Sequence, residues 1–168
     1  MQYNKLINEK VHSYYWNDDL NCAITSLLTF SEIFQINLNT QILDAAIGMP
    51  GAGSYGAQCG LVAGALMFIG IQGKEKGLET EDIVNRCNDF AKGFEDEFGS
   101  LNCRDLRPEG FKPENPPHLC EEITKKAIMF TLKYLNSVKI VDIYNWIAQN
   151  ALQDESGMTH IYPRSRRR

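Results

Sequence analysis

Apolar residues recur at helical spacing along most of this chain, and no long alternating run typical of a strand interrupts them. This periodicity constrains the fold more than any other feature, and it predicts an all-α protein. The chain has 168 residues, of which 43% are hydrophobic, which is enough for one core. We therefore expect a bundle of about six helices in a single domain over residues 1–155. A flexible basic tail should follow over residues 156–168, where four of the last five residues are arginine.

Capping residues and prolines divide the chain into predicted helices. Asn17 or Asp18 would cap the first helix, Asn39 the second and Thr80 a long one that ends at Gly99. Proline at position 116 suits a further helix start. The expected helices cover residues 20–34, 40–47, 57–70, 80–98, a short stretch around 103, 116–134 and 140–152, with 57–70 as the central helix.

Four of the five cysteines stand where a predicted helix begins. A helix start offers unpaired N–H groups and the positive end of the helix dipole, so it should favour the thiolate and lower the pKa of the thiol. The fifth, Cys87, lies in the middle of a helix in line with apolar residues and is interpreted as a small buried hydrophobe. The four cysteines of interest are Cys22, Cys59, Cys103 and Cys120.

Their spacing excludes a compact Cys-x-x-Cys knuckle, so only tertiary folding can bring them together. Scattered cysteines in a chain without a secretory signal indicate a reducing, cytoplasmic location and a metal-binding or catalytic role. Four soft thiolates suit an iron-sulfur cluster or a zinc ion, and pairs of them suit thiol-disulfide exchange. The residue types do not separate these alternatives.

A glycine-rich segment over residues 48–60 leads into the central helix. Its Gly51, Gly53 and Gly56 match the dinucleotide fingerprint G-x-G-x-x-G, but no strand precedes them and no βαβ unit follows. We interpret these glycines and Gly60 as residues that let the backbone approach the cysteines and offer N–H groups to sulfur. Gly60 and Gly64 are also expected to form a close contact face of the central helix.

Charge and hydropathy restrict the partners. The net charge of −4 gives no general attraction to nucleic acid. The longest apolar stretch, residues 61–71, is about half of a membrane span, so no membrane insertion is expected. Arg104 could hold a thiolate by charge, or pair with Asp105 or a helix end. His118 could serve as a further ligand or a proton donor, but it is interpreted as an exposed loop residue. The expected partner is a redox protein of unknown identity, and a homodimer stays open.

Several spaced blocks resemble one family. Asn21-Cys22-Ala23, the glycine segment running into Cys59-Gly60-Leu61, Phe98-Gly99-Ser100 followed by Cys103-Arg104, and Cys120 are similar to the C_GCAxxG_C_C family of redox-active proteins. The resemblance covers residues 14–135. The four cysteines of the family pattern fall on Cys22, Cys59, Cys103 and Cys120, and leave Cys87 outside. The one departure is Leu61, where the family has alanine.

Similar domains occur in cytochromes of the split-Soret type, where the cysteines accompany an iron-sulfur centre beside haem. The resemblance therefore implies a cluster-binding electron carrier that lacks the haem part. The leading hypothesis is that the four cysteines converge on one [2Fe-2S] or comparable cluster. The alternatives are a thiol-disulfide oxidoreductase that uses cysteine pairs and a helical module with a structural zinc.

Overall fold

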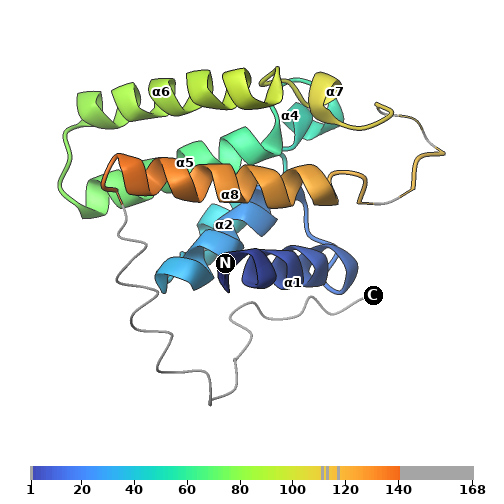
Figure 1. Cartoon of the computed structure of the whole chain (residues 1–168), viewed down its shortest axis with the longest axis horizontal. Helices are drawn as coiled ribbons and strands as arrows, with labels where there is room; N and C mark the ends of the chain where they lie inside the picture. The colour runs from blue at the N-terminus through green and yellow to red at the C-terminus, as the bar shows by residue number, and fades with distance from the viewer. Residues whose placement is uncertain (1, 111, 113, 117, 141–168) are drawn as a thin grey trace, which may run out of the picture.

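The computed structural model describes residues 2–140 except 111, 113 and 117 (Figure 1). This part of the chain contains helices and no strand, which confirms the all-α prediction. Almost all of the helix predicted over 140–152, and the whole tail over 156–168, lie outside the described residues. The helices are α1 (Gln2–Trp16), α2 (Cys22–Phe34), α3 (Thr40–Ala45), α4 (Gly51–Ser54), α5 (Gly60–Glu75), α6 (Thr80–Phe98), α7 (Cys103–Leu106) and α8 (Glu121–Ser137).

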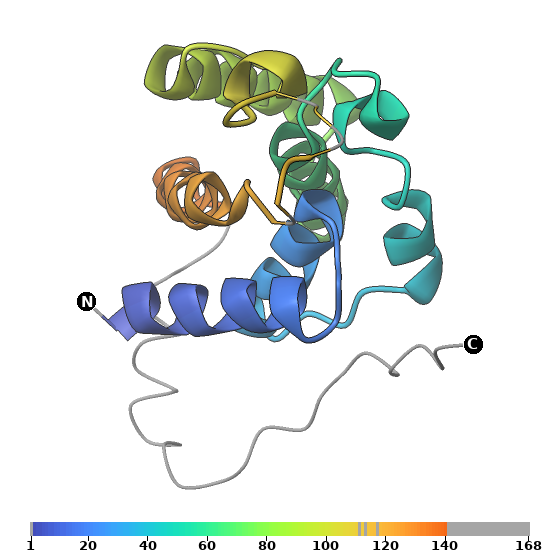
Figure 2. The ribbon, with the colours of Figure 1, turned by 90° about the vertical axis from the view of Figure 1, so that its right-hand side faces the viewer.

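Helix α5 occupies the centre, as expected. It packs against α2, α6 and α8, while α1 packs against α2 and α8. Figure 1 shows α6 running along one side of this core and α1 on the other, and Figure 2 shows the same layers from the end. Helix α5 buries apolar side chains on most of its circumference, including Leu61, Ala65, Phe68 and Ile69. None of the described helices is long and apolar enough to cross a membrane.

Glycine 64 lets α5 and α2 approach closely, as predicted from its spacing with Gly60. A Cβ at Gly64 would lie 2.9 Å from the carbonyl oxygen of Ala23 and 3.4 Å from the Cβ of Ser26. The first distance is shorter than a van der Waals contact, so any side chain at this position would push α2 away. This contact fixes where α5 lies along the axis of α2, next to the first turns of α2.

Helix α6 buries one stripe, with Phe90 and Phe94 fully buried against α8. Their ring centroids lie 5.7 and 6.0 Å from that of Phe130 in α8. The N-cap of this helix is Glu79 and not Thr80, which is its first helical residue, whereas Gly99 ends the helix with φ +86°, as predicted. Val84 is 59% exposed although it is apolar, because one residue after the buried Ile83 the helix has turned by about 100°.

Helix α1 was not expected, because the N-terminal segment is polar overall. Nevertheless its apolar side chains recur every three or four residues and pack into the core. The polar side chains occupy the remaining faces, which makes this an ordinary amphipathic surface helix. The part of the chain described here therefore holds more helices than the six predicted for the bundle. The buried residues of α1 are Tyr3, Ile7, Val11, Tyr14 and Tyr15.

Three predicted helix starts lie a few residues too early, those of α2, α5 and α8. Helix α8 begins at Glu121 and not at residue 116. Helix α2 is capped by Asn21, whose Oδ1 accepts hydrogen bonds from the amides of Ala23 (2.9 Å) and Ile24 (3.0 Å). Neither Asn17 nor Asp18 takes this role. Helix α5 starts at Gly60 and not at residue 57, because residues 57–59 pair with 101–103 around an isolated antiparallel bridge.

Candidate redox centre

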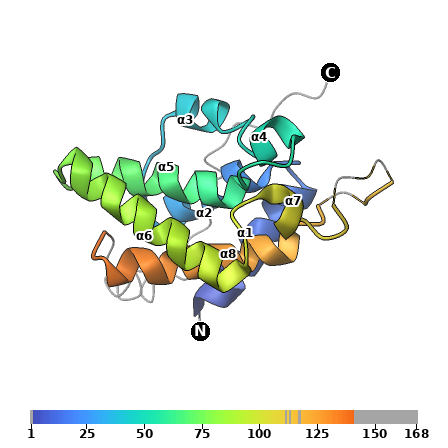
Figure 3. The same cartoon turned by 90° about the horizontal axis from the view of Figure 1, so that it is seen from above.

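All four cysteines singled out in the sequence stand at helix starts. Cys22 is the first residue of α2 and Cys103 the first of α7, while Cys59 and Cys120 are the N-cap residues of α5 and α8. Figures 1 and 3 show that α5, α7 and α8 begin at the same end of the molecule, with α4 beside α7. Cys22, Cys59 and Cys103 are buried, and Cys120 is half-buried.

The short bridge between two loops brings Cys59 and Cys103 together. The amide of Cys59 donates to the carbonyl of Leu101 (2.8 Å), and the amide of Cys103 donates to that of Ala57 (2.7 Å). Because side chains alternate between the faces of an extended pair, Cys59 and Cys103 project to the same side. A side-chain hydrogen bond with Cys59 is the largest cause that raises the pKa of the Cys103 thiol.

Cys22 and Cys120 complete the group. Burial raises the pKa of Cys22 to about 12, and the charges of Cys120 and then Cys103 add to the rise. The charge of Cys103 also raises the pKa of Cys120. Each of the four side chains therefore interacts with at least one of the others. The structure brings these cysteines together from four separate segments of the chain.

The prediction that helix starts lower the thiol pKa is wrong for three of these cysteines. The pKa values of Cys22, Cys103 and Cys120 are all raised. For Cys22, the amides of Cys22 and Ala23 do lower the pKa, but burial outweighs them. Burial disfavours the charged thiolate, and neighbouring thiolates repel one another. As bare thiols these groups stay protonated at neutral pH.

Two of the four predicted glycines lie against the sulfurs. A Cβ at Gly60 would lie 2.6 Å from the Sγ of Cys22, and one at Gly51 would lie 3.4 Å from the Sγ of Cys103. The other two do not reach the cysteines. A Cβ at Gly53 would meet nothing within 4 Å, and one at Gly56 would contact Arg104. Lack of a side chain at Gly51 and Gly60 thus leaves room for sulfur.

The amides of Gly51, Gly53 and Gly56 do not donate the expected hydrogen bonds to the cysteine sulfurs. In α4 all four residues have positive φ, and Gly51 and Gly53 adopt this left-handed conformation without the strain that Cβ brings. The amide of Gly51 donates to Gln58 (3.0 Å), that of Gly53 to Gly48 (2.8 Å) and that of Gly56 to Gly51 (2.9 Å). All three acceptors are carbonyl oxygens, so the prediction of N–H to sulfur bonds is wrong for these glycines.

Arg107, and not Arg104, lies beside the sulfurs. Arg104 donates from Nε to the carbonyl of Gly56 (3.1 Å), and its guanidinium lies over the ring of Tyr55. Arg107 places Nη1 3.9 Å from the Sγ of Cys120, and its positive charge lowers the pKa of both Cys103 and Cys120. The signal for Arg107 was its position four residues after Cys103, which is one helical turn.

Two aromatic contacts around Cys120 were also missed. Tyr15 is buried, and the charges of Cys22, Cys120 and Cys59 contribute to the rise of its pKa after burial itself. Its ring stacks on that of His118 at 5.2 Å between centroids, and Trp16 approaches His118 edge-on at 4.9 Å. His118 is therefore packed between aromatic rings, with 15% of its side chain exposed, which contradicts the exposed-loop interpretation.

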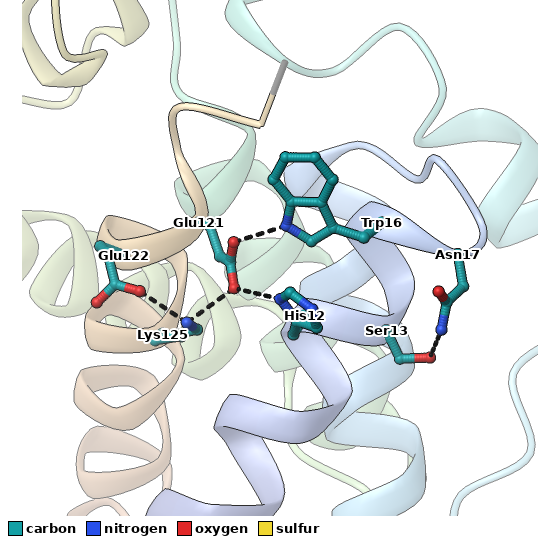
Figure 4. A network of polar contacts seen from close by, with 7 residues as sticks. All are labelled: His12, Ser13, Trp16, Asn17, Glu121, Glu122 and Lys125. Carbon is teal, nitrogen blue, oxygen red and sulfur yellow. Dashed lines mark hydrogen bonds and ion pairs between the residues drawn. The ribbon is translucent and has the colours of Figure 1, made fainter. Parts of the chain in front are cut away.

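A polar network ties the start of α8 to the end of α1 next to Cys120 (Figure 4). The carboxylate of Glu121 accepts from Nε1 of Trp16 (2.8 Å) and Nζ of Lys125 (2.8 Å), and lies 3.0 Å from Nδ1 of His12. Burial raises the pKa of Glu121, but the hydrogen bonds of Lys125, Trp16 and His12 outweigh it and lower the pKa to about 2. These contacts hold Cys120 close to Tyr15.

Cys87 lies apart from this group. It stands in the middle of α6, half-buried rather than largely buried, and burial raises its pKa. Its charge acts on Tyr134 of α8. Among the residues that the structure describes, no three His, Cys, Asp or Glu side chains are arranged to hold a single metal ion. The four cysteines are neighbours without meeting at one point.

Comparison with known proteins agrees with this arrangement. Residues 20–134 match the family model described as "Putative redox-active protein (C_GCAxxG_C_C)". The chain belongs to this family. It is also 28% identical over 135 residues to an uncharacterized protein of Archaeoglobus fulgidus, an alignment that covers 73% of this chain and 89% of the relative. No solved structure is significantly similar to it.

Proposed function

We propose that Cys22, Cys59, Cys103 and Cys120 hold one iron-sulfur cluster and that the protein transfers electrons. The observation that supports this most is the gathering of four thiols from four helix starts, three of them buried. Four thiols are the usual ligand set of such clusters, whereas most buried cysteines stand alone among apolar side chains.

The chemistry of these four thiols suits a cluster better than a single metal ion. A metal deprotonates a thiol that coordinates it. Its positive charge also balances the negative charge of the thiolate, which burial alone would disfavour. A single metal ion needs all its ligands around one point. Among the described residues no three His, Cys, Asp or Glu side chains are arranged in this way. In a [2Fe-2S] cluster the cysteines divide between two irons, so the Cys59–Cys103 pair and the Cys22–Cys120 pair suit it better.

When bound, such a cluster would take up and release one electron. The chain itself contributes the surroundings of the centre. The missing side chains of Gly51 and Gly60 leave space beside the sulfurs of Cys103 and Cys22. Tyr15 and the start of α5 keep water from the buried sulfurs, because both are buried themselves. A dry, fixed environment of this kind controls the potential of a metal centre.

A second candidate is thiol-disulfide exchange by the Cys59–Cys103 pair, which their side-chain hydrogen bond favours. In that reaction Cys59 and Cys103 would form a disulfide bond, while the disulfide bond of a partner breaks and takes up the two electrons and two protons to become two thiols. Burial of both cysteines argues against it, since attack requires an accessible thiolate. No observation of this structure favours the structural zinc.

The electron partner would be a redox protein, and the cytoplasm its compartment. Three of the four cysteines are buried, so the centre would reach solvent most readily near the half-buried Cys120. The partner would therefore approach the beginning of α8, where Trp16 is half exposed.

The test is the visible spectrum, iron and acid-labile sulfide of protein prepared without oxygen. The proposal expects coloured protein with iron and sulfide in equal amounts. Colourless protein without metal, whose Cys59 and Cys103 form a disulfide on mild oxidation, would replace it with thiol exchange. Colourless protein with stoichiometric zinc would overturn it in favour of a structural site.

A further inference from the structure

The guanidinium of Arg107 is fixed next to the cysteines by contacts on both sides. The residue directly follows α7, and its amide donates to the carbonyl of Cys103 (2.9 Å). Nε donates to the carbonyl of Gly110 (2.9 Å), while Nη1 lies 3.9 Å from the Sγ of Cys120. A planar guanidinium anchored through Nε can turn only little, so its charge stays beside this sulfur.

The same charge reaches a second sulfur. Arg107 acts electrostatically on Cys103 as well as on Cys120. The side chain is half-buried, and screening by salt is weaker for partly buried charges than for exposed ones. One cation thus acts electrostatically on two of the four sulfurs.

We propose that Arg107 raises the reduction potential of the centre by placing a fixed positive charge beside the sulfur of Cys120 and within electrostatic reach of Cys103. The inference rests on the proposed function. On reduction the cluster gains one electron from a one-electron reductant, no bond to the protein changes, and the centre becomes more negative by one charge. A nearby cation stabilises that added charge and shifts the equilibrium toward the reduced form.

Arg104 provides a matched control. It stands three residues earlier, in the short helix α7 that Arg107 follows, and carries the same charge. Its guanidinium, however, is held by the carbonyl of Gly56 and the ring of Tyr55. Replacing either arginine with glutamine changes the net charge equally, so a difference between the two variants reports the position of the charge.

The experiment is a redox titration with dithionite and mediator dyes, followed by visible absorption, on wild type, Arg107→Gln, Arg107→Lys and Arg104→Gln. We expect Arg107→Gln to reduce the reduced-to-oxidised ratio about tenfold at the wild-type midpoint, which is a shift of about 59 mV for one electron. Arg107→Lys should shift the potential less, and Arg104→Gln should leave it unchanged. Arg107→Met retains the apolar stem and replaces the glutamine variant if that variant does not fold.

An unchanged potential in the neutral Arg107 variant, or an equal shift in Arg104→Gln, would overturn the inference. Absence of a cluster from the wild type would instead refute the proposed function. In that case the effect of the Arg107 charge is measured in the metal-free protein, as the rate at which iodoacetamide alkylates the thiol of Cys120. Arg107→Gln should then react more slowly than Arg104→Gln at one pH, and equal rates would again refute the role of Arg107.

Discussion

Substitution of Gly64 by alanine tests whether the close approach of α5 and α2 holds the fold together. The new Cβ would lie 2.9 Å from the carbonyl oxygen of Ala23 and 3.4 Å from its Cα. Both are backbone atoms, so no side-chain rotation relieves the contact and one helix must move. Overpacking of this kind costs about 1 to 3 kcal/mol, while alanine gains about 0.8 to 1.0 kcal/mol over glycine in a helix. The variant should lose about 0 to 2 kcal/mol.

Gly70 in the same helix supplies the control, because a Cβ there would meet nothing within 4 Å. Gly70→Ala should gain about 1 kcal/mol from helix propensity alone. The two variants should therefore differ by about 1 to 3 kcal/mol, which is the packing cost itself. Urea unfolding followed by circular dichroism measures this difference if both transitions have the same slope.

The larger Gly64→Leu extends the same reasoning to function. It should displace α2 further, move Cys22 away from the other sulfurs and remove the redox centre while all four cysteines remain. The reasoning fails if Gly64→Ala is as stable as Gly70→Ala, or if Gly64→Leu keeps both wild-type stability and a full complement of iron.

Two further predictions follow from the site. Gly60→Ala would place a Cβ 2.6 Å from the Sγ of Cys22. It should therefore remove most of the bound iron while it changes the unfolding midpoint only slightly. A wild-type iron content in this variant would contradict the contact. The pKa of Glu121 is lowered from 4.5 to about 2. Its contribution to stability is therefore complete above pH 4.5 and is lost as the pH falls toward 2, amounting to no more than about 3 kcal/mol. In Glu121→Gln the unfolding free energy should depend less on pH in that window, and an unaltered slope would argue against the network in Figure 4.

Helix positions were predictable from the sequence where apolar periodicity and a chemical end signal agree. Asn39 caps α3 and Gly99 closes α6 as predicted. The true cap of α2, Asn21, was overlooked because Asn17 and Asp18 are equally good capping residues by type. Helix α1 was missed because its average hydropathy is low although its period is clear.

The placement of the cysteines at helix starts was also predictable, whereas their electrostatics were not. Whether burial or the helix start decides a thiol pKa depends on tertiary packing, and for Cys22 burial prevails. Which of Arg104 and Arg107 lies next to a cysteine sulfur depends on the direction of the side chain. Adjacency in the sequence does not reveal that direction. Likewise Gly53 and Gly56 match the motif but lie away from the sulfurs, since the turn of α4 points them elsewhere.

The central claim is that Cys22, Cys59, Cys103 and Cys120 form one centre to which Cys87 does not belong. Iron per chain, measured in all five single Cys→Ser variants prepared without oxygen, tests this most directly. Serine is a poor ligand for soft metal sites, so each of the four variants should lose most of its iron and its visible absorption. Cys87→Ser should retain both. Full iron in any one of the four, or loss of iron in Cys87→Ser, would contradict the account.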